Sequence, residues 1–174
     1  MFKLLLSALL LTSCATKLPL KEDLKPIEIV GKENIFNHRS SLSWVKELSK
    51  VANCTVNLKS FQDELSTIER FDYSDDNGKQ VLSKLLSDAK TITTYKTKNP
   101  WSSAMATTYS ADKDNMYLNT RKNPREYKFM VNTVCHEKLH LNGYSHGNNS
   151  SVGKENTVNY FVGSLCEKHS KGCL

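Results

Sequence analysis

Three of the five histidines in this 174-residue chain lie close together, at positions 136, 140 and 146. Because His136 and His140 are four residues apart, an α-helix places both imidazoles on one face, where they can bind one metal ion. Gly143 can adopt the left-handed conformation that ends a helix, so the chain can turn there and bring His146 back. Three imidazoles at one point leave the fourth position of a tetrahedral zinc ion open, as in catalytic zinc sites. The sequence therefore predicts a helix that ends near Gly143 and carries one zinc ion.

Glu137 directly follows the first predicted ligand. A carboxylate at this position can reach a zinc-bound water without binding the metal itself, accept a proton from it and deliver that proton to a leaving amine. We therefore predict Glu137 as the general base, with the three histidines as zinc ligands. Glu155 and Glu167 are weaker alternatives for the third ligand. Two other interpretations stay open, namely a helix with fortuitous histidines and a metal site without activity.

The string from His136 to His146 reads His-Glu-x-x-His-x-x-Gly-x-x-His and resembles the zinc-binding motif of the metzincin peptidases. The resemblance covers this motif alone. It implies a mixed sheet with packed helices, and a cleft whose edge strand holds an extended peptide by strand addition. It also implies hydrolysis of a peptide bond by a zinc-activated water.

One departure from the metzincin pattern concerns the methionine turn that lies beneath the metal, downstream of the third histidine. All four methionines of this chain precede His146. Residues 157–160 are the expected substitute. By resemblance, Tyr160 would approach the metal or stabilise an oxyanion; a core aromatic at the start of the last helix is the alternative.

Hydrophobic periodicity predicts the remaining elements. Apolar residues at helical spacing indicate helices within residues 44–51, 58–68 and 81–89, and a short closing helix within 158–165. β-branched and aromatic residues indicate strands at 91–95, 104–109 and 116–120, the last two forming a hairpin around a polar turn at 110–115. Asn123 as cap, Pro124 as first helical residue and Glu126 three residues after the cap predict where the helix with the histidines begins. The expected fold class is α+β: a small mixed sheet with packed helices, metzincin-like, in which the active-site helix precedes a short C-terminal helical portion.

The N-terminus has the pattern of an export signal. Lys3 is followed by an apolar run at residues 4–11 that is too short to span a bilayer, and Cys14 comes just after it. This arrangement resembles the lipobox of bacterial lipoproteins. We therefore predict a signal peptide at 1–13, a lipid on Cys14, a tether at 14–38 and a catalytic domain at 39–174. A secretory signal that happens to carry a cysteine is the alternative. Ala15 after the cysteine indicates the outer membrane if the host is Gram-negative.

Four further cysteines, Cys54, Cys135, Cys166 and Cys173, are an even number in a chain expected to be exported, and they suggest two disulfides. Three connectivities are open. Cys166 and Cys173 are close in sequence and could close a small terminal loop, in which case Cys54 would pair with Cys135. Free buried thiols are the alternative.

The net charge of +6 is spread along the chain without a basic run, so no nucleic-acid partner is expected. The expected partners are a protein or peptide substrate and, through the lipid, a membrane; the protein is expected to be a monomer in the cell envelope. Peptidoglycan cross-links are an alternative amide substrate. A non-catalytic zinc-binding surface lipoprotein and a structural envelope protein held by disulfides are alternative functions. His38 and His169 are expected at the surface.

Overall fold

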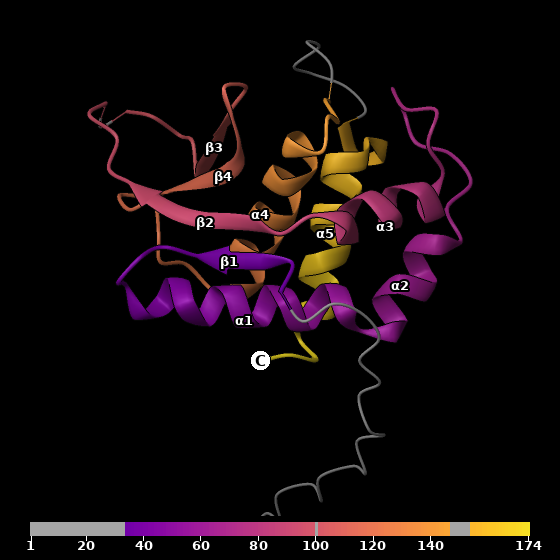
Figure 1. The fold of residues 1–174 in the computed structure, drawn as a ribbon, viewed down its shortest axis with the longest axis horizontal. Coiled ribbons are helices and arrows are strands. Elements are labelled where there is room, and N and C mark those ends of the chain that lie inside the picture. Colours follow the sequence, from indigo (N-terminus) through magenta and orange to yellow (C-terminus); the bar gives the residue numbers. More distant parts are fainter. Residues whose placement is uncertain (1–33, 100, 147–153) are drawn as a thin grey trace, which may run out of the picture.

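The computed structural model describes residues 34–99, 101–146 and 154–174, and the fold class is α+β as predicted. A four-stranded mixed sheet packs against helices (Figure 1). The elements of the described residues are β1 (Phe36–His38), α1 (Ser43–Asn57), α2 (Lys59–Ser66), α3 (Gly78–Ser87), β2 (Lys90–Tyr95), β3 (Ala106–Tyr109), β4 (Asp112–Asn119), α4 (Tyr127–Leu141), a single 3-10 turn η1 (Lys154–Asn156) and α5 (Val158–Ser170).

The sheet has the strand order β1-β2-β4-β3. Strands β1, β2 and β4 run parallel to one another, whereas β3 runs antiparallel to β4. Ile92 lies opposite Met116, which also lies opposite Thr108 on β3. Strand β3 is therefore an edge strand, with one side paired to β4 and the other facing away from the sheet.

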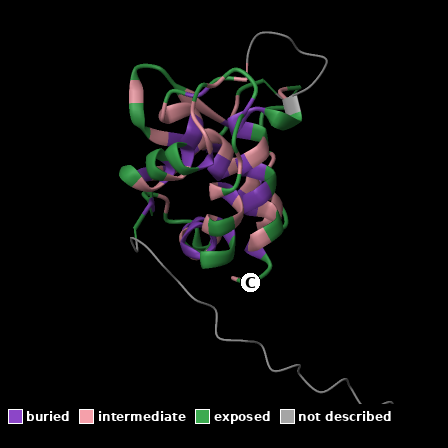
Figure 2. Ribbon diagram, turned by 90° about the vertical axis from the view of Figure 1, so that its right-hand side faces the viewer, coloured by how far each residue is buried: buried purple, intermediate pink, exposed green. Residues whose placement is uncertain are grey.

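One face of the sheet is buried by helices. Figure 1 shows α1 running along β1 and β2, and α4 contacts β3 and β4. Because side chains alternate along a strand, the residues of this face are spaced by two. They are buried together with the apolar faces of α1, α4 and α5. Figure 2 shows this buried layer between exposed outer surfaces. The sheet residues of the core are Phe36, Ile92, Ala106, Met116 and Leu118.

The helices and the three strands expected from periodicity are confirmed, with a shorter turn in the hairpin. The turn expected at 110–115 is too long, because β4 already begins at Asp112. A register shift between Thr108 and Tyr109 brings Tyr109 opposite Asp112, and the Asp112 carboxylate accepts hydrogen bonds from Asn115 and Tyr117 on its own strand. The polar residues of this region are therefore part of a strand.

The folded part of the chain includes residues that were expected to form the tether. Ile35 and Phe36 are buried, and the backbone N–H groups of both donate to Oδ1 of Asn53 on α1, at 2.7 and 2.9 Å. The Asn53 amide also donates to the Phe36 carbonyl. Residues 34–38 thus belong to the domain; the predicted signal peptide and Cys14 lie outside the described residues.

Helix α4 begins at Tyr127, later than the predicted start, with Glu126 in place of Asn123 as its cap residue. Asn123 is buried and its amide donates to the carbonyls of Met105 and Asn119. Asn123 therefore links the strand region to the chain that enters α4, because its side chain finds backbone partners outside the helix.

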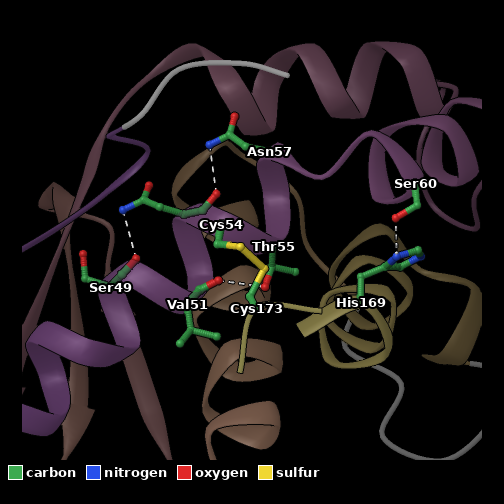
Figure 3. The surroundings of a disulfide bond; sticks show 9 residues. Ser49, Val51, Cys54, Thr55, Asn57, Ser60, His169 and Cys173 are labelled. Carbon is green, nitrogen blue, oxygen red and sulfur yellow. Dashed lines mark hydrogen bonds between the residues drawn. A yellow bond between two sulfur atoms is a disulfide. The ribbon is translucent and has the colours of Figure 1, made fainter. Parts of the chain in front are cut away.

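Two disulfides join distant elements, but the suggested connectivity is wrong. Cys135 on α4 pairs with Cys166 on α5, and Cys54 on α1 pairs with Cys173 near the C-terminus (Figure 3). Cys166 points into the core from the middle of α5, whereas Cys173 lies beyond the end of that helix. Proximity in sequence therefore does not bring Cys166 and Cys173 together.

None of the helices in the described part of the chain combines the length and the apolar character of a membrane span.

Candidate metal centre

The predicted metal ligands lie at the C-terminal end of α4, where the helix ends as the sequence indicates. Gly143 has φ of +93°. Its N–H donates to the His140 carbonyl, and the N–H of Tyr144 donates to the Leu139 carbonyl, which is the hydrogen-bond pattern of a Schellman motif. This reversal directs the chain back toward the helix and brings His146 beside the two helical histidines.

The three imidazoles converge. One ligand nitrogen from each of His136, His140 and His146 lies within 4.8 Å of the other two. The Nε2 atoms of His136 and His140 are 3.1 Å apart. Two nitrogens at 2.0–2.1 Å from a tetrahedral zinc ion are separated by about 3.3 Å, so this spacing fits such an ion. The three histidines therefore form a group that can hold a metal ion.

Hydrogen bonds to the ring nitrogens of the histidines determine which nitrogen can bind a metal ion. Nδ1 of His140 is 2.9 Å from the Tyr144 carbonyl oxygen, so Nδ1 carries the hydrogen and Nε2 presents its lone pair to His136. The imidazole of His136 is hydrogen-bonded to the backbone of Asn159. Nδ1 of His146 is buried and has no hydrogen-bond partner among the described residues. A buried polar atom without a partner is costly.

Burial keeps two of these histidines neutral. Burial, and then the charges of His140 and His146, lower the pKa of His136 to about 3. Burial also lowers the pKa of His140, opposed by its hydrogen bond to Tyr144. Neutral imidazole is the form that binds a metal, so at neutral pH these side chains need not lose a proton first.

The start of α5 supports the cluster from the side. Asn159 is fully buried, and its Nδ2 donates to the His136 carbonyl at 3.3 Å, while the ring of His136 is hydrogen-bonded to the Asn159 backbone. The ring of Tyr160 lies 4.7 Å from the ring of His136 and 5.3 Å from that of His146, measured between centroids. The segment expected to replace the methionine turn therefore contacts the histidines, and Tyr160 borders them with its side chain partly exposed.

Glu137 lies in the same cleft as the three histidines. The cleft has a volume of about 530 Å³, and its other wall is β3 with the residues that follow it, from Ala106 to Ser110. Burial raises the pKa of Glu137 to about 7, opposed by a hydrogen bond from Thr108 on β3. The free edge of β3, the candidate base and the metal group thus open onto one space, in which an extended chain could lie against the strand.

The remaining candidates lie elsewhere. Glu155 is exposed, and Glu167 accepts a hydrogen bond from Asn132, so neither belongs to the metal group. His38 is exposed as expected. The expectation for His169 is wrong, because its imidazole is largely buried at the edge of Phe61 and its Nε2 lies 2.9 Å from Glu64 (its contact with Ser60 appears in Figure 3). Tyr144 is buried, and its hydroxyl donates to Asp76.

Two residues around the site were not predicted individually. Asn159 belongs to the segment 157–160, and Thr108 belongs to the strand expected at 104–109. Neither belongs to a motif, and each reaches the site only because α5 or β3 packs beside α4. A polar residue within an apolar helical stripe, as at Asn159, was the single available indication.

No family model matches the chain, and comparison with curated protein sequences and with solved structures finds no match either.

Proposed function

We propose that this protein is a zinc-dependent metallopeptidase of metzincin-like character. The observation that carries the proposal is the convergence of three imidazoles with Glu137 in a single cleft that has a β-strand edge along its wall. Three neutral nitrogen ligands suit zinc and leave a coordination position for reaction. Bound zinc supplies a water of lowered pKa and a Lewis acid for the scissile carbonyl.

Different protein groups have the remaining roles in the proposed reaction. The free edge of β3 provides backbone donors and acceptors that can align an extended peptide across the cleft. Glu137 accepts the proton of the attacking water and transfers it to the leaving amine, with Thr108 holding its carboxyl group in place. Asn159 and the Tyr144 carbonyl orient His136 and His140. Tyr160, whose ring lies beside two of the ligands, is the proposed donor of a hydrogen bond to the oxyanion.

The decisive experiment separates catalysis from metal binding. We expect the purified protein to hold one zinc ion per chain and to cleave a peptide mixture, with cleavage abolished by a chelator. Glu137→Ala should lower kcat by about 10²- to 10⁴-fold, the range for loss of a general base, while zinc content stays at one. Glu155→Ala, which removes an exposed carboxylate outside the cleft, is the matched control.

Two results would contradict the proposal. Equal cleavage by Glu137→Ala and the parent protein would refute the assigned base. Full zinc occupancy without hydrolysis of any peptide would favour a non-catalytic zinc-binding protein. A different outcome, cleavage of peptidoglycan cross-links alone, would keep the hydrolase and restrict its substrate to that polymer.

We also propose that the protein is attached to the cell envelope by a lipid on Cys14. The order of Lys3, the apolar run and the cysteine supports this location, and two disulfides are typical of oxidising compartments. Labelling of growing cells with an alkyne fatty acid should mark the parent protein and not Cys14→Ser. Equal labelling of both would disprove the attachment.

A further inference from the structure

The cleft at the histidines continues into a second hollow. This hollow has a volume of about 360 Å³ and shares Lys113, Leu141 and Gly143 with the cleft. The residues that line it are Lys84, Ser87, Asp88, Lys90, Lys113, Leu141, Asn142 and Gly143. Three lysines and a single aspartate thus surround a space that adjoins the metal group, and we refer to it as the lysine hollow.

The lysines of this hollow differ in how well their charges are matched. Lys84 pairs with Asp76 at 2.5 Å. Lys90 is 9% exposed and its ammonium lies 3.4 Å from Asp114, whose own side chain is 83% exposed and well solvated. The aspartate of the lining, Asp88, also interacts electrostatically with a fourth lysine, the buried Lys138. Asp76 and Asp114 are therefore paired with Lys84 and Lys90, whereas the Asp88 carboxylate forms no ion pair among the described residues.

Lys113 is the lysine that stands between the hollow and the cleft. It is exposed at the start of β4 and, within the part of the chain that the structure describes, its ammonium makes no hydrogen bond or ion pair. The carboxylate of its neighbour Asp112 is engaged by Asn115 and Tyr117. An ammonium without a partner, at the junction of two hollows, is suited to bind an anion that enters the cleft.

We propose that the lysine hollow selects substrates with a carboxylate on one side of the scissile bond, and that Lys113 makes the direct contact. This inference rests on the proposed peptidase function and names its substrate class as acidic peptides. Lys84 and Lys90 add to the positive potential of the hollow, and Lys113 is a specificity-determining residue. The carboxylate can come from an acidic side chain or from the free C-terminus of a peptide.

The test uses quenched fluorescent peptides of one sequence that carry a single Glu moved position by position, each matched by a peptide with Gln. A further pair ends in a free carboxylate or an amide, which distinguishes the two sources. We expect one position, or the free C-terminus, to give a kcat/KM about five-fold above its neutral match, the upper range for an exposed ion pair. The ratio should fall toward one in Lys113→Met and as ionic strength rises.

Lys79→Met is the matched control, because Lys79 is exposed on α3 and lines neither hollow. It should keep the ratio of the parent protein. Equal ratios in the parent and in Lys113→Met would overturn the proposal while leaving the peptidase function intact.

Binding of the same peptides to the zinc-loaded Glu137→Ala variant, followed by fluorescence anisotropy, separates the two hypotheses. Tighter binding of the acidic peptide that depends on Lys113, without hydrolysis by the parent protein, would support the lysine hollow and refute the peptidase. Absence of charge-dependent binding, with or without hydrolysis, would refute the lysine hollow.

Discussion

At the scale of single residues, the site depends on the nitrogen atoms of three half-buried histidines. Nδ1 of His146 is buried without a partner among the described residues, and the Nε2 atoms of His136 and His140 face each other. A cation between these two nitrogens would bind the lone pairs of both. The same reasoning explains why His38, which is exposed, carries no comparable indication of binding.

Removal of one of the three histidines should therefore lower the affinity for the metal ion. We expect His146→Ala to weaken zinc binding by more than about 100-fold, the upper end of the losses seen when a group beyond the ligands is removed. His38→Ala should leave the affinity unchanged. Competition with a zinc-sensitive chelating dye measures both. An affinity of His146→Ala equal to that of the parent would remove His146 from the ligand set.

At the scale of elements, the site depends on the pairing of α4 with α5. These two helices make the most extensive contact between elements, and they approach closely where Gly163 faces Asn132. A Cβ at position 163 would lie 2.6 Å from Asn132 Oδ1 and 3.2 Å from its carbonyl oxygen. Asn159 and Tyr160, one turn before Gly163, depend on this close approach to reach His136.

Gly163→Ala tests the close approach. Overpacking costs about 1–3 kcal/mol, whereas the gain in helix propensity returns about 1 kcal/mol, so we expect a net loss of up to about 2 kcal/mol in the free energy of unfolding. Ser164→Ala, at the exposed neighbouring position, should be neutral or slightly stabilising. Urea denaturation measures both variants, and a Gly163→Ala variant more stable than Ser164→Ala would contradict the packing described.

At the scale of the whole molecule, the two disulfides support different parts of the structure. Cys54–Cys173 attaches the C-terminal end to α1 across 119 residues, whereas Cys135–Cys166 joins the site helix to α5 across 31 residues. Cys135 directly precedes His136 in sequence. The second disulfide is therefore part of the support of the metal group, and the first acts on the fold alone.

Replacing each cysteine pair by alanine should distinguish an effect on stability from an effect on zinc affinity. Chain-entropy arguments give a loss of about 5 kcal/mol in stability without Cys54–Cys173 and about 4 kcal/mol without Cys135–Cys166. We expect zinc affinity, measured on the folded fraction at low temperature, to fall only in the Cys135→Ala/Cys166→Ala variant. Equal zinc affinity in both variants would show that the α4–α5 disulfide does not support the site.

The stability of the molecule should also depend on pH through Asp76. Hydrogen bonds from Lys84 and then Tyr144 lower the pKa of Asp76 below its ordinary value. A carboxyl group with a depressed pKa stabilises the fold above its unfolded pKa, and this contribution is lost as the pH falls through the folded pKa. Asp76→Asn should therefore destabilise the protein at neutral pH, with a gap that narrows in acid. Thermal unfolding across pH measures it, with the exposed Asp75→Asn as control.

Much of this protein is determined locally, and local features were predictable from the sequence. Helical periodicity indicated α1, α2, α3 and α5, and β-branched residues indicated β2 to β4. The spacing of His136 and His140 and the stop at Gly143 required only the geometry of a helix and its end. The convergence of His146 follows from the same few residues, because Gly143 and the Tyr144 backbone make the return themselves.

Only the tertiary structure decided which distant residues support that site. The pairing of Cys135 with Cys166, the role of Asn123 before α4, the contacts of Asn159 with His136 and the burial of His169 each join parts far apart in sequence. Such contacts depend on which helix faces pack together, a choice that is made by the summed burial of the whole core. A motif of a few residues therefore does not predict which helix faces pack together.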